Sequence, residues 1–360
     1  MDISGCKAEE NRCPPCCFLE GSSFDQCIEK IKGLCSYLLT PFWKGEELIH
    51  RSILPFLPGQ NILELANRFF QFSMGLGLTI VGFPLALGGL LVTGICNQFH
   101  LRDFRYLKGE LVPQKEGNKF LHLNTCMFPG GLPLSFGGVM PACFRLNQLN
   151  RLLKEIKPDL LFLSEFNRTL VPPLYEAIKK EYAHFFVDIG LNGAGLESCL
   201  FIACRTQILT PPRYFPFRVL SIGEQKQINR GFFLLQNEEC WSVFTHLHPH
   251  ESREARAVRQ AELLEIVEEI KKLPNNKSCY LIGDLNINRF DPLGEYEYLL
   301  SLGFTDQQNE IHEGTKEVVD YFLIYQGKKE SRFDVSLIGS DGVLSDHPLL
   351  VATRQSNLFD

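Results

Sequence analysis

The chain has no excess of positive charge. Its 360 residues contain 36 Lys and Arg against 42 Asp and Glu, which gives a formal net charge of −6 at pH 7. Proteins dedicated to duplex DNA usually present a strongly basic face, so this balance argues against that class. Hydrophobic residues make up 45% of the sequence, and a chain of this length and composition can build one large domain with an appendage.

A disulfide framework is also missing, although cysteine is abundant. The 13 cysteines are odd in number and irregularly spaced, whereas disulfide-stabilised domains carry an even set at regular spacing. Several of them occur in apolar runs and are typical of small core residues, namely Cys199, Cys204, Cys240 and Cys279. We therefore expect the part of the chain beyond its N-terminal region to reside in a reducing, cytosolic compartment.

One long stretch lacks charge altogether. No charged residue lies between Arg68 and His100, and an uncharged run of this length meets the length criterion for a membrane-spanning helix. Pro84 and several glycines within it fit either a kinked span or the turn of a re-entrant hairpin. The alternative is a buried helix of a soluble protein. The run begins too far from Met1 for a cleaved signal peptide, and we expect residues 69–99 to associate with a membrane.

Short apolar segments and cysteines precede this run. CSYLLTPFW and ILPFLPG can lie in a membrane interface, and Cys13, Cys16 and Cys17 can carry acyl chains. A metal knuckle or unmodified thiols are the alternatives for these cysteines, and the knuckle lacks a histidine or a second CxxC pair. We assign residues 1–116 to a cysteine-rich, hydrophobic membrane-associating region, with a polar connector at residues 101–119. Flanking charges do not fix an orientation.

Strand-like and helix-like runs alternate from residue 117 onward. Short apolar runs predict strands at residues 120–125, 160–163, 200–204, 231–235, 240–247, 280–283, 321–325 and 349–353. Helical spacing predicts helices at residues 144–156, 171–182 and 254–273. Many strands with helices between some of them fit two packed sheets with helices on the outer faces. We expect an α/β domain over residues 117–360.

Polar motifs stand at the ends of apolar runs. They are LHLNT with Asn124, LLFLSEFN with Glu165, VFTHLHPH with His246, YLIGDLNIN with Asp284 and Asn286, VVDYFLIY with Asp320, and SDHPLL with Asp346 and His347. Carboxylates, amides and imidazoles at the strand ends of one sheet are what metal-assisted hydrolysis of a phosphate ester requires.

The ordered set resembles the endonuclease/exonuclease/phosphatase superfamily of DNase I-like, metal-dependent phosphodiesterases. The resemblance covers roughly Gly117 to Arg354, and in character it is similar to neutral sphingomyelinases. It implies a four-layered sandwich of two mixed β-sheets flanked by helices, preceded here by the hydrophobic N-terminal region. It also implies Mg²⁺ as the cofactor, with Mn²⁺ as a substitute.

Phosphodiester chemistry explains why these residue types occur together. A divalent ion neutralises the anionic oxygens, a base activates water, and a donor stabilises the leaving oxygen. Glu165 follows the apolar run LLFL, where an unpaired carboxylate is costly, so it is the main candidate ligand for Mg²⁺. Asp284 and Asn286 alternate by two and project from the same side of an extended segment. The first can orient or deprotonate water, and the second can donate to a phosphoryl oxygen.

Imidazoles complete the candidate site. Asp320 can orient His347 as a general base or a phosphate contact, because a carboxylate behind an imidazole fixes its tautomer and raises its basicity. The sequence leaves open whether His347 or Asp284 is the base. The resemblance implies that His246 stabilises the phosphoryl oxygen or the leaving group.

Three further features bear on this interpretation. His248 and His250 follow His246 at alternate positions and suggest zinc, but the strand period and the missing thiolates favour His246 alone. Arg230 can contact phosphate, and we expect it to be a surface residue before a turn. Cys126 stands where DNA-cleaving relatives often carry Asp, and a thiol is a poor ligand for Mg²⁺. This departure favours the sphingomyelinase-like branch over abasic-site nucleases.

The resemblance implies further ligands, with Asn124 helping to hold metal and phosphate and Asp346 binding metal directly or through water. We therefore expect a Mg²⁺-dependent phosphodiesterase that hydrolyses a phospholipid headgroup phosphoester at a phospholipid membrane. A DNase I-like nuclease is the alternative, although nothing points strongly to nucleic acid and it would need a basic groove within an acidic chain. A membrane-anchored, non-catalytic interaction protein is the alternative from another class. The complete motif set argues against it.

Overall fold

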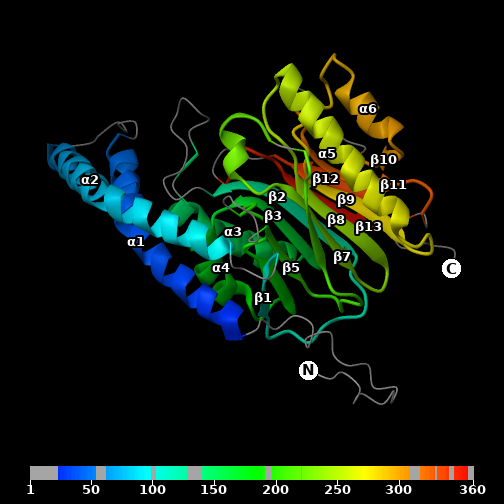
Figure 1. Cartoon of the computed structure of the whole chain (residues 1–360), viewed down its shortest axis with the longest axis horizontal. Coiled ribbons are helices and arrows are strands. Elements are labelled where there is room, and N and C mark those ends of the chain that lie inside the picture. The colour runs from blue at the N-terminus through cyan, green and yellow to red at the C-terminus, as the bar shows by residue number, and fades with distance from the viewer. Residues whose placement is uncertain are drawn as a thin grey trace.

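A computed structural model describes most of the chain and shows two parts, a pair of long N-terminal helices and a β-sandwich (Figure 1). The described residues are 23–53, 62–98, 103–127, 139–140, 142–190, 197–219, 221–308, 317–328, 331–339 and 344–355. The expected acylation sites Cys13, Cys16 and Cys17 lie outside these ranges, as does most of ILPFLPG.

One sheet has seven strands in the order β1-β4-β5-β3-β2-β13-β12. The strands are β1 (Arg105–Lys108), β2 (Lys119–Met127), β3 (Leu160–Phe166), β4 (His184–Val187), β5 (Phe201–Cys204), β12 (Phe333–Ile338) and β13 (Leu349–Arg354). β2 and β3 pair in parallel, and the other neighbours pair antiparallel. The expected connector at residues 101–119 is wrong in part, because β1 pairs with β4 at the sheet edge. A four-residue strand with a cation at each end leaves too little apolar pattern to be recognised.

The second sheet has six strands in the order β10-β11-β9-β8-β7-β6. The strands are β6 (Arg213–Pro216), β7 (Gly231–Gln236), β8 (Cys240–His246), β9 (Ser278–Asp284), β10 (Phe304–Asp306) and β11 (Asp320–Tyr325). β8 and β9 pair in parallel, and the other neighbours pair antiparallel. Both sheets are therefore mixed.

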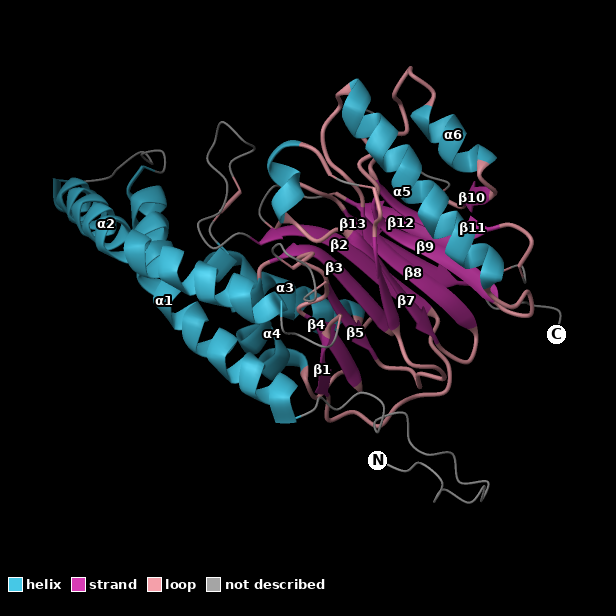
Figure 2. Cartoon of the chain, viewed as in Figure 1, coloured by secondary structure: helices cyan, strands magenta, loops and turns pink. Residues whose placement is uncertain are grey.

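Helices cover the outer faces of the two sheets (Figure 2). They are α3 (Ala142–Ile156) and α4 (Val171–Ile178) on the seven-stranded sheet, and α5 (Arg253–Lys272) and α6 (Glu295–Ser301) on the six-stranded sheet. Short 3₁₀ turns lie at Arg168–Leu170 and Gly223–Gln227. The four layers confirm the predicted fold class.

Two hydrophobic clusters hold the layers together. One joins the facing sides of the two sheets and extends under α5, and the other lies between the seven-stranded sheet and helices α3 and α4. Cys204, Cys240 and Cys279 are buried, as expected of small core residues, and Cys199 is half-buried. Along β3 of the seven-stranded sheet, consecutive apolar residues therefore belong to different clusters, because they point to opposite faces.

The N-terminal part is a hairpin of two long helices, α1 (Ser23–Ile53) and α2 (Ile62–Gln98) (Figure 1). α2 continues through Pro84 as one helix, so the alternative of a turn inside residues 69–99 is wrong. Proline within a helix removes a single backbone hydrogen bond, which long apolar helices tolerate. CSYLLTPFW lies within α1, and its position in a membrane interface stays a prediction.

Glycines allow the two helices to approach backbone to backbone. A Cβ at Gly82 would lie 2.4 Å from the backbone nitrogen of Phe42, and one at Gly89 would lie 2.9 Å from the carbonyl oxygen of Cys35. A Cβ at Gly45 would lie 2.4 Å from the hydroxyl of Thr79. Small residues at a close helix contact are typical of helices paired within a membrane.

The surface of α2 that faces away from α1 is apolar. By length and composition, α2 can cross a membrane over Leu63–Thr93. Large apolar side chains remain exposed along it, among them Phe69, Phe70, Ile80, Val81, Phe83 and Leu91. Soluble proteins rarely expose a continuous apolar surface of this kind, which marks a contact with lipid or with another protein.

The glycine contacts can be tested with a matched pair of substitutions. Gly82→Leu should separate α1 from α2, because overpacking of a tight contact costs about 1–3 kcal/mol. Gly77→Leu is the control, since a Cβ at Gly77 meets nothing within 4 Å. Thermal unfolding of the full chain in detergent micelles, followed by circular dichroism, should show a lower transition for Gly82→Leu alone. Equal transitions for the two variants would contradict the close contact.

Candidate active site

Three strands of the six-stranded sheet present polar side chains at the same level. His246 at the end of β8 pairs with Asp284 at the end of β9, and Asp284 pairs with Asp320 at the start of β11. Residues directly opposite one another on neighbouring strands project from the same face. Strand register alone therefore gathers an imidazole and two carboxylates, and all three are buried.

The glycine before Asp284 permits this register. Gly283 has φ 152°, and a Cβ at this position would lie 1.9 Å from the carbonyl oxygen of Thr245 on β8. Only glycine fits so close a backbone approach. The GD step of the GDLN motif is thus a packing requirement that delivers Asp284 to the site.

Backbone turns at the ends of β2 and β3 direct Glu165 inward. Leu163 and Phe166 both belong to the cluster beneath α3 and α4, although strict alternation would place residues three apart on opposite faces. Glu165 interrupts the alternation with φ 51°, and Cys126 does the same on β2 with φ 45°. A non-glycine residue in this region is strained, and such strain tends to occur at functional sites.

Asn124 links the carboxylates of the two sheets. Its Nδ2 donates a hydrogen bond of 2.9 Å to Asp284 Oδ2, and its side chain is also hydrogen-bonded to Glu165. Its Oδ1 accepts from the backbone N–H of Cys126 at 3.1 Å. The amide nitrogen thus faces the carboxylates, so this geometry lets Asn124 position both of them. Its role as a metal ligand stays a prediction.

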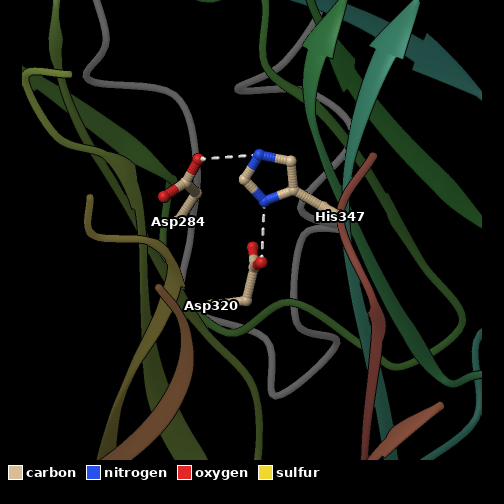
Figure 3. A group of neighbouring side chains, drawn as sticks. All are labelled: Asp284, Asp320 and His347. Atoms are coloured by element: carbon tan, nitrogen blue, oxygen red, sulfur yellow. Dashed lines mark hydrogen bonds and ion pairs between the residues drawn. The ribbon is translucent and has the colours of Figure 1, made fainter. Parts of the chain in front are cut away.

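His347 lies between two carboxylates of the opposite sheet (Figure 3). Its Nδ1 is 2.8 Å from Asp320 Oδ2, and its Nε2 is 3.9 Å from Asp284 Oδ2. The preceding Ser345 is buried and donates a 2.6 Å hydrogen bond to the carbonyl oxygen of Asn124. The SDH motif is therefore fastened to β2 while its imidazole reaches across to β9 and β11.

Charge pairing sets the ionisation of this pair. Burial acts against a charged imidazole, but the neighbouring Asp320 and Asp284 carboxylates outweigh it and raise the pKa of His347 to about 11. Burial likewise acts to raise the pKa of Asp320, but His347 and His122 outweigh it and hold that pKa below its ordinary value. At neutral pH the pair is an imidazolium and a carboxylate.

Glu165 has the opposite environment, because no cation neutralises it fully. Burial, followed by repulsion from Asp284, raises the pKa of Glu165 to about 7, while His347 only partly offsets these effects. Its Oε1 lies 3.8 Å from His246 Nε2, and burial holds the pKa of His246 well below its ordinary value, so that imidazole is neutral. A divalent cation would satisfy this carboxylate.

A further oxygen donor near Glu165 is Asp346, which is exposed to solvent. Its carboxylate interacts electrostatically with Glu165 and accepts a hydrogen bond from the Cys126 thiol. Burial, followed by the Asp346 and Glu165 charges, raises the pKa of Cys126, so the thiol stays protonated and is no ligand. Two carboxylates with room for water fit the preference of Mg²⁺ for oxygen.

A second group of possible metal ligands lies next to this one. Asp284, Asp320 and His347 place one ligand atom each within 4.8 Å of the others. However, both oxygens of Asp320 already face imidazole nitrogens. A metal bound there would have to displace these hydrogen bonds. A metal bound at Glu165 would instead balance the negative charge of that carboxylate. Glu165 is the better candidate.

The structure brings all seven residues predicted to be catalytic into one cluster. Asn286, with φ 51°, donates its backbone N–H to Asp284 Oδ1 at 2.9 Å and its Nδ2 to the carbonyl oxygen of Leu247 at 3.0 Å. His248 and His250 do not join the metal-competent group found among the described residues. Glu165 and His347 interact electrostatically, so they lie in the same region of the structure.

The expectation that Arg230 lies on the surface is wrong, and the sequence led to no prediction for Arg145 and His122 near the site. Arg230 is buried instead of lying on the surface, and its Nη1 donates to the carbonyl oxygens of His246 and Leu247 at 2.9 and 2.8 Å. Arg145 of α3 is buried and donates to the carbonyl oxygens of Thr125 and Leu344. His122 on β2 contacts Asp320. A cation on the apolar face of a helix was the available signal for Arg145.

Comparison with known proteins identifies solved structures that share this fold. No family model and no curated protein matches the chain. Solved structures do match: beta toxin of Staphylococcus aureus, with 18% identity and a TM-score of 0.54, covers 66% of this chain and 100% of its own. Sphingomyelinase C of Streptomyces griseocarneus, also 18% identical with a TM-score of 0.52, covers 67% and 100%. The chain has the endonuclease/exonuclease/phosphatase fold.

Another structure with this fold is TDP2 of D. rerio in complex with a single-strand DNA product. It is 17% identical with a TM-score of 0.50, and it covers 66% of this chain and 99% of its own. A beta toxin mutant of Staphylococcus aureus, 18% identical with a TM-score of 0.53, has bound magnesium ions. Proteins with this fold thus include both a lipid-directed enzyme and one bound to DNA, so the fold alone does not choose a substrate.

Binding of Mg²⁺ should depend on pH through Glu165. Because its pKa is about 7 without metal, the carboxyl must lose a proton to ligate, and affinity should rise about tenfold from about pH 6 to about pH 8. Glu165→Gln should bind much more weakly and lose this pH dependence, while the exposed Glu155→Gln should behave as wild type. Isothermal titration calorimetry measures both properties. Equal wild-type affinities at the two pH values would count against Glu165 as a ligand.

Proposed function

We propose that this protein is a Mg²⁺-dependent phosphodiesterase that hydrolyses a phospholipid headgroup phosphoester, in the manner of a sphingomyelinase. The observation that carries the proposal is the convergence of Glu165, Asp284, His246 and His347 where the two sheets meet. Asp284 Oδ2 lies 3.5 Å from His246 Nε2 and 3.9 Å from His347 Nε2, and Glu165 Oε1 lies 3.8 Å from His246 Nε2. A single phosphate can contact all four side chains.

Each residue has a role that follows from its environment. Glu165 and Asp346 would hold Mg²⁺, which supplies charge neutralisation of the phosphoryl oxygens. The imidazolium of His347, oriented by Asp320, donates a hydrogen bond to a phosphoryl oxygen. Asn286 has one amide hydrogen beyond its bond to Leu247 and donates it to the same group.

Asp284 is the acceptor for the proton of the attacking water. The imidazolium of His347 already carries both of its protons, so it has no acceptor to offer, whereas burial raises the pKa of Asp284 and makes it a stronger base. Asn124 and the backbone N–H of Asn286 hold its two oxygens in place. The net reaction consumes one water and releases an alcohol and a phosphomonoester.

A cavity next to the site favours a headgroup without strong negative charge. It has a volume of about 310 Å³ and includes Asn286 in its wall. Its charged lining residues are Glu251, Asp291, Glu295 and Glu317 against Arg256 and Arg259. Arg259 is neutralised by a two-point salt bridge to Glu295 at 2.8 and 2.7 Å. The acidic remainder suits a phosphocholine headgroup better than a polyanionic nucleic acid.

The exposed apolar surface of α2 supports the choice of a lipid substrate. Membrane association through residues 69–99 would hold the catalytic domain at the bilayer surface, where headgroups are presented. With the free thiols of the sandwich, such as Cys204 and Cys240, the proposal places that domain on the reducing, cytosolic side.

A substrate panel tests the proposal with the full chain and Mg²⁺. Sphingomyelin vesicles should release phosphocholine and leave ceramide, while phosphoinositide vesicles and single- or double-stranded DNA should react slowly. Asp284→Asn should lower the rate by roughly 10²–10⁴-fold, as expected for loss of a general base, and the exposed Glu155→Gln should not. Efficient DNA cleavage without headgroup release from any vesicle would overturn the lipid assignment.

A further inference from the structure

His122 is a buried histidine of β2 for which the proposed chemistry gives no role. It lies two residues before Asn124, so both side chains point from β2 toward the six-stranded sheet. Its side chain is completely buried, and its Nε2 is 2.9 Å from Asp320 Oδ1. The contact joins the two sheets directly beneath the candidate active site.

The contact makes Asp320 a bridge between two imidazoles. His122 Nε2 faces one carboxylate oxygen at 2.9 Å, and His347 Nδ1 faces the other at 2.8 Å. Because an ionised carboxylate only accepts hydrogen bonds, His122 Nε2 carries a proton and donates it. Each oxygen of the fully buried Asp320 therefore already has an imidazole partner, which fixes the orientation of the carboxylate.

The other ring nitrogen of His122, Nδ1, is buried and has no polar partner among the residues that the structure describes. The His122 ring stacks on Phe162, with centroids 4.9 Å apart and planes inclined by 23°. A buried polar atom without a partner is costly, so an apolar residue would suit this position better unless the bond to Asp320 is useful.

We propose that His122 is a positioning residue that fixes the Asp320 carboxylate, and through it the orientation of His347. The rate effect of this role rests on the proposed function, but the hydrogen-bond geometry does not. With Asp320 held from behind, its Oδ2 receives His347 Nδ1–H, and His347 Nε2 points toward Asp284. Without His122, one buried oxygen loses its donor and the carboxylate can turn away from His347.

Two substitutions separate this role from simple packing. His122→Leu keeps an apolar side chain of similar size and removes the donor, whereas His122→Gln places an amide N–H near the position of Nε2. His122→Leu should lower kcat by about 10–100-fold with KM unchanged, as is typical for partners that orient a reactive group. His122→Gln should recover most of this loss. Equal kcat values for the two variants, low or high, would overturn the proposal.

A second buried histidine provides the matched control. His184 on β4 is also buried, and its Nδ1 lies 3.0 Å from the Tyr106 hydroxyl. His184→Leu should lower the melting temperature without changing kcat, and a comparable loss of kcat would show that His122→Leu acts through general destabilisation. If His122→Leu does not fold, His122→Asn replaces it, since its shorter amide cannot reach Asp320. It should show the same loss of kcat.

Proton NMR gives a readout that does not depend on activity. The proton between His347 Nδ1 and Asp320 should give a far-downfield resonance, identified by its absence from His347→Gln. The resonance should persist in His122→Gln and disappear or move upfield in His122→Leu. An unchanged resonance in His122→Leu would overturn the positioning role. Absence of hydrolysis by the wild type would instead overturn the proposed function and leave this test valid.

Discussion

Negative charge gathered at the meeting edge of the two sheets is the constraint on which this structure depends. Glu165, Asp284 and Asp320 are brought close together away from bulk water, where carboxylates repel one another and lose hydration. Imidazoles on both sides of Asp320 and amide donors to Asp284 offset this repulsion and loss of hydration. Nearby groups offset the burial and charge repulsion of Glu165 only in part, and its pKa therefore rises to about 7. A divalent ion bound to Glu165 would supply the balancing positive charge.

The positions of these groups follow from ordinary sheet geometry with a few local departures. Register places His246, Asp284 and Asp320 side by side on three neighbouring strands. Positive φ angles at Glu165 and Cys126 then reset the alternation of their strands. These strained residues cost free energy that the surrounding sandwich must supply. The candidate site is therefore built on paired strands, and its charges are not balanced from within.

Much of this could be predicted from the sequence, for identifiable reasons. Apolar runs that end in a polar motif predicted the strands that carry Asn124, Glu165 and Asp284. Their side chains could be expected to meet because strand ends at one edge of a sandwich lie close together, independently of the loop conformations. Strand β1 escaped, because its polar ends resemble a connector. The sequence left open whether the chain continues through Pro84 as one helix, because proline marks both turns and tolerated helix positions. His122 and Arg230 look ordinary in sequence, and only tertiary contacts across the sheets reveal their partners.

The central claim is that the missing positive charge belongs beside Glu165. The most direct test is a crystal structure of the protein soaked in Mn²⁺, with the ion located by anomalous scattering. The account predicts a peak about 2.1 Å from a Glu165 oxygen, on the side of Asp346, with the hydrogen bonds of Asp320 to both imidazoles intact. A peak coordinated by Asp320 and His347, with Glu165 left unbound, would contradict it.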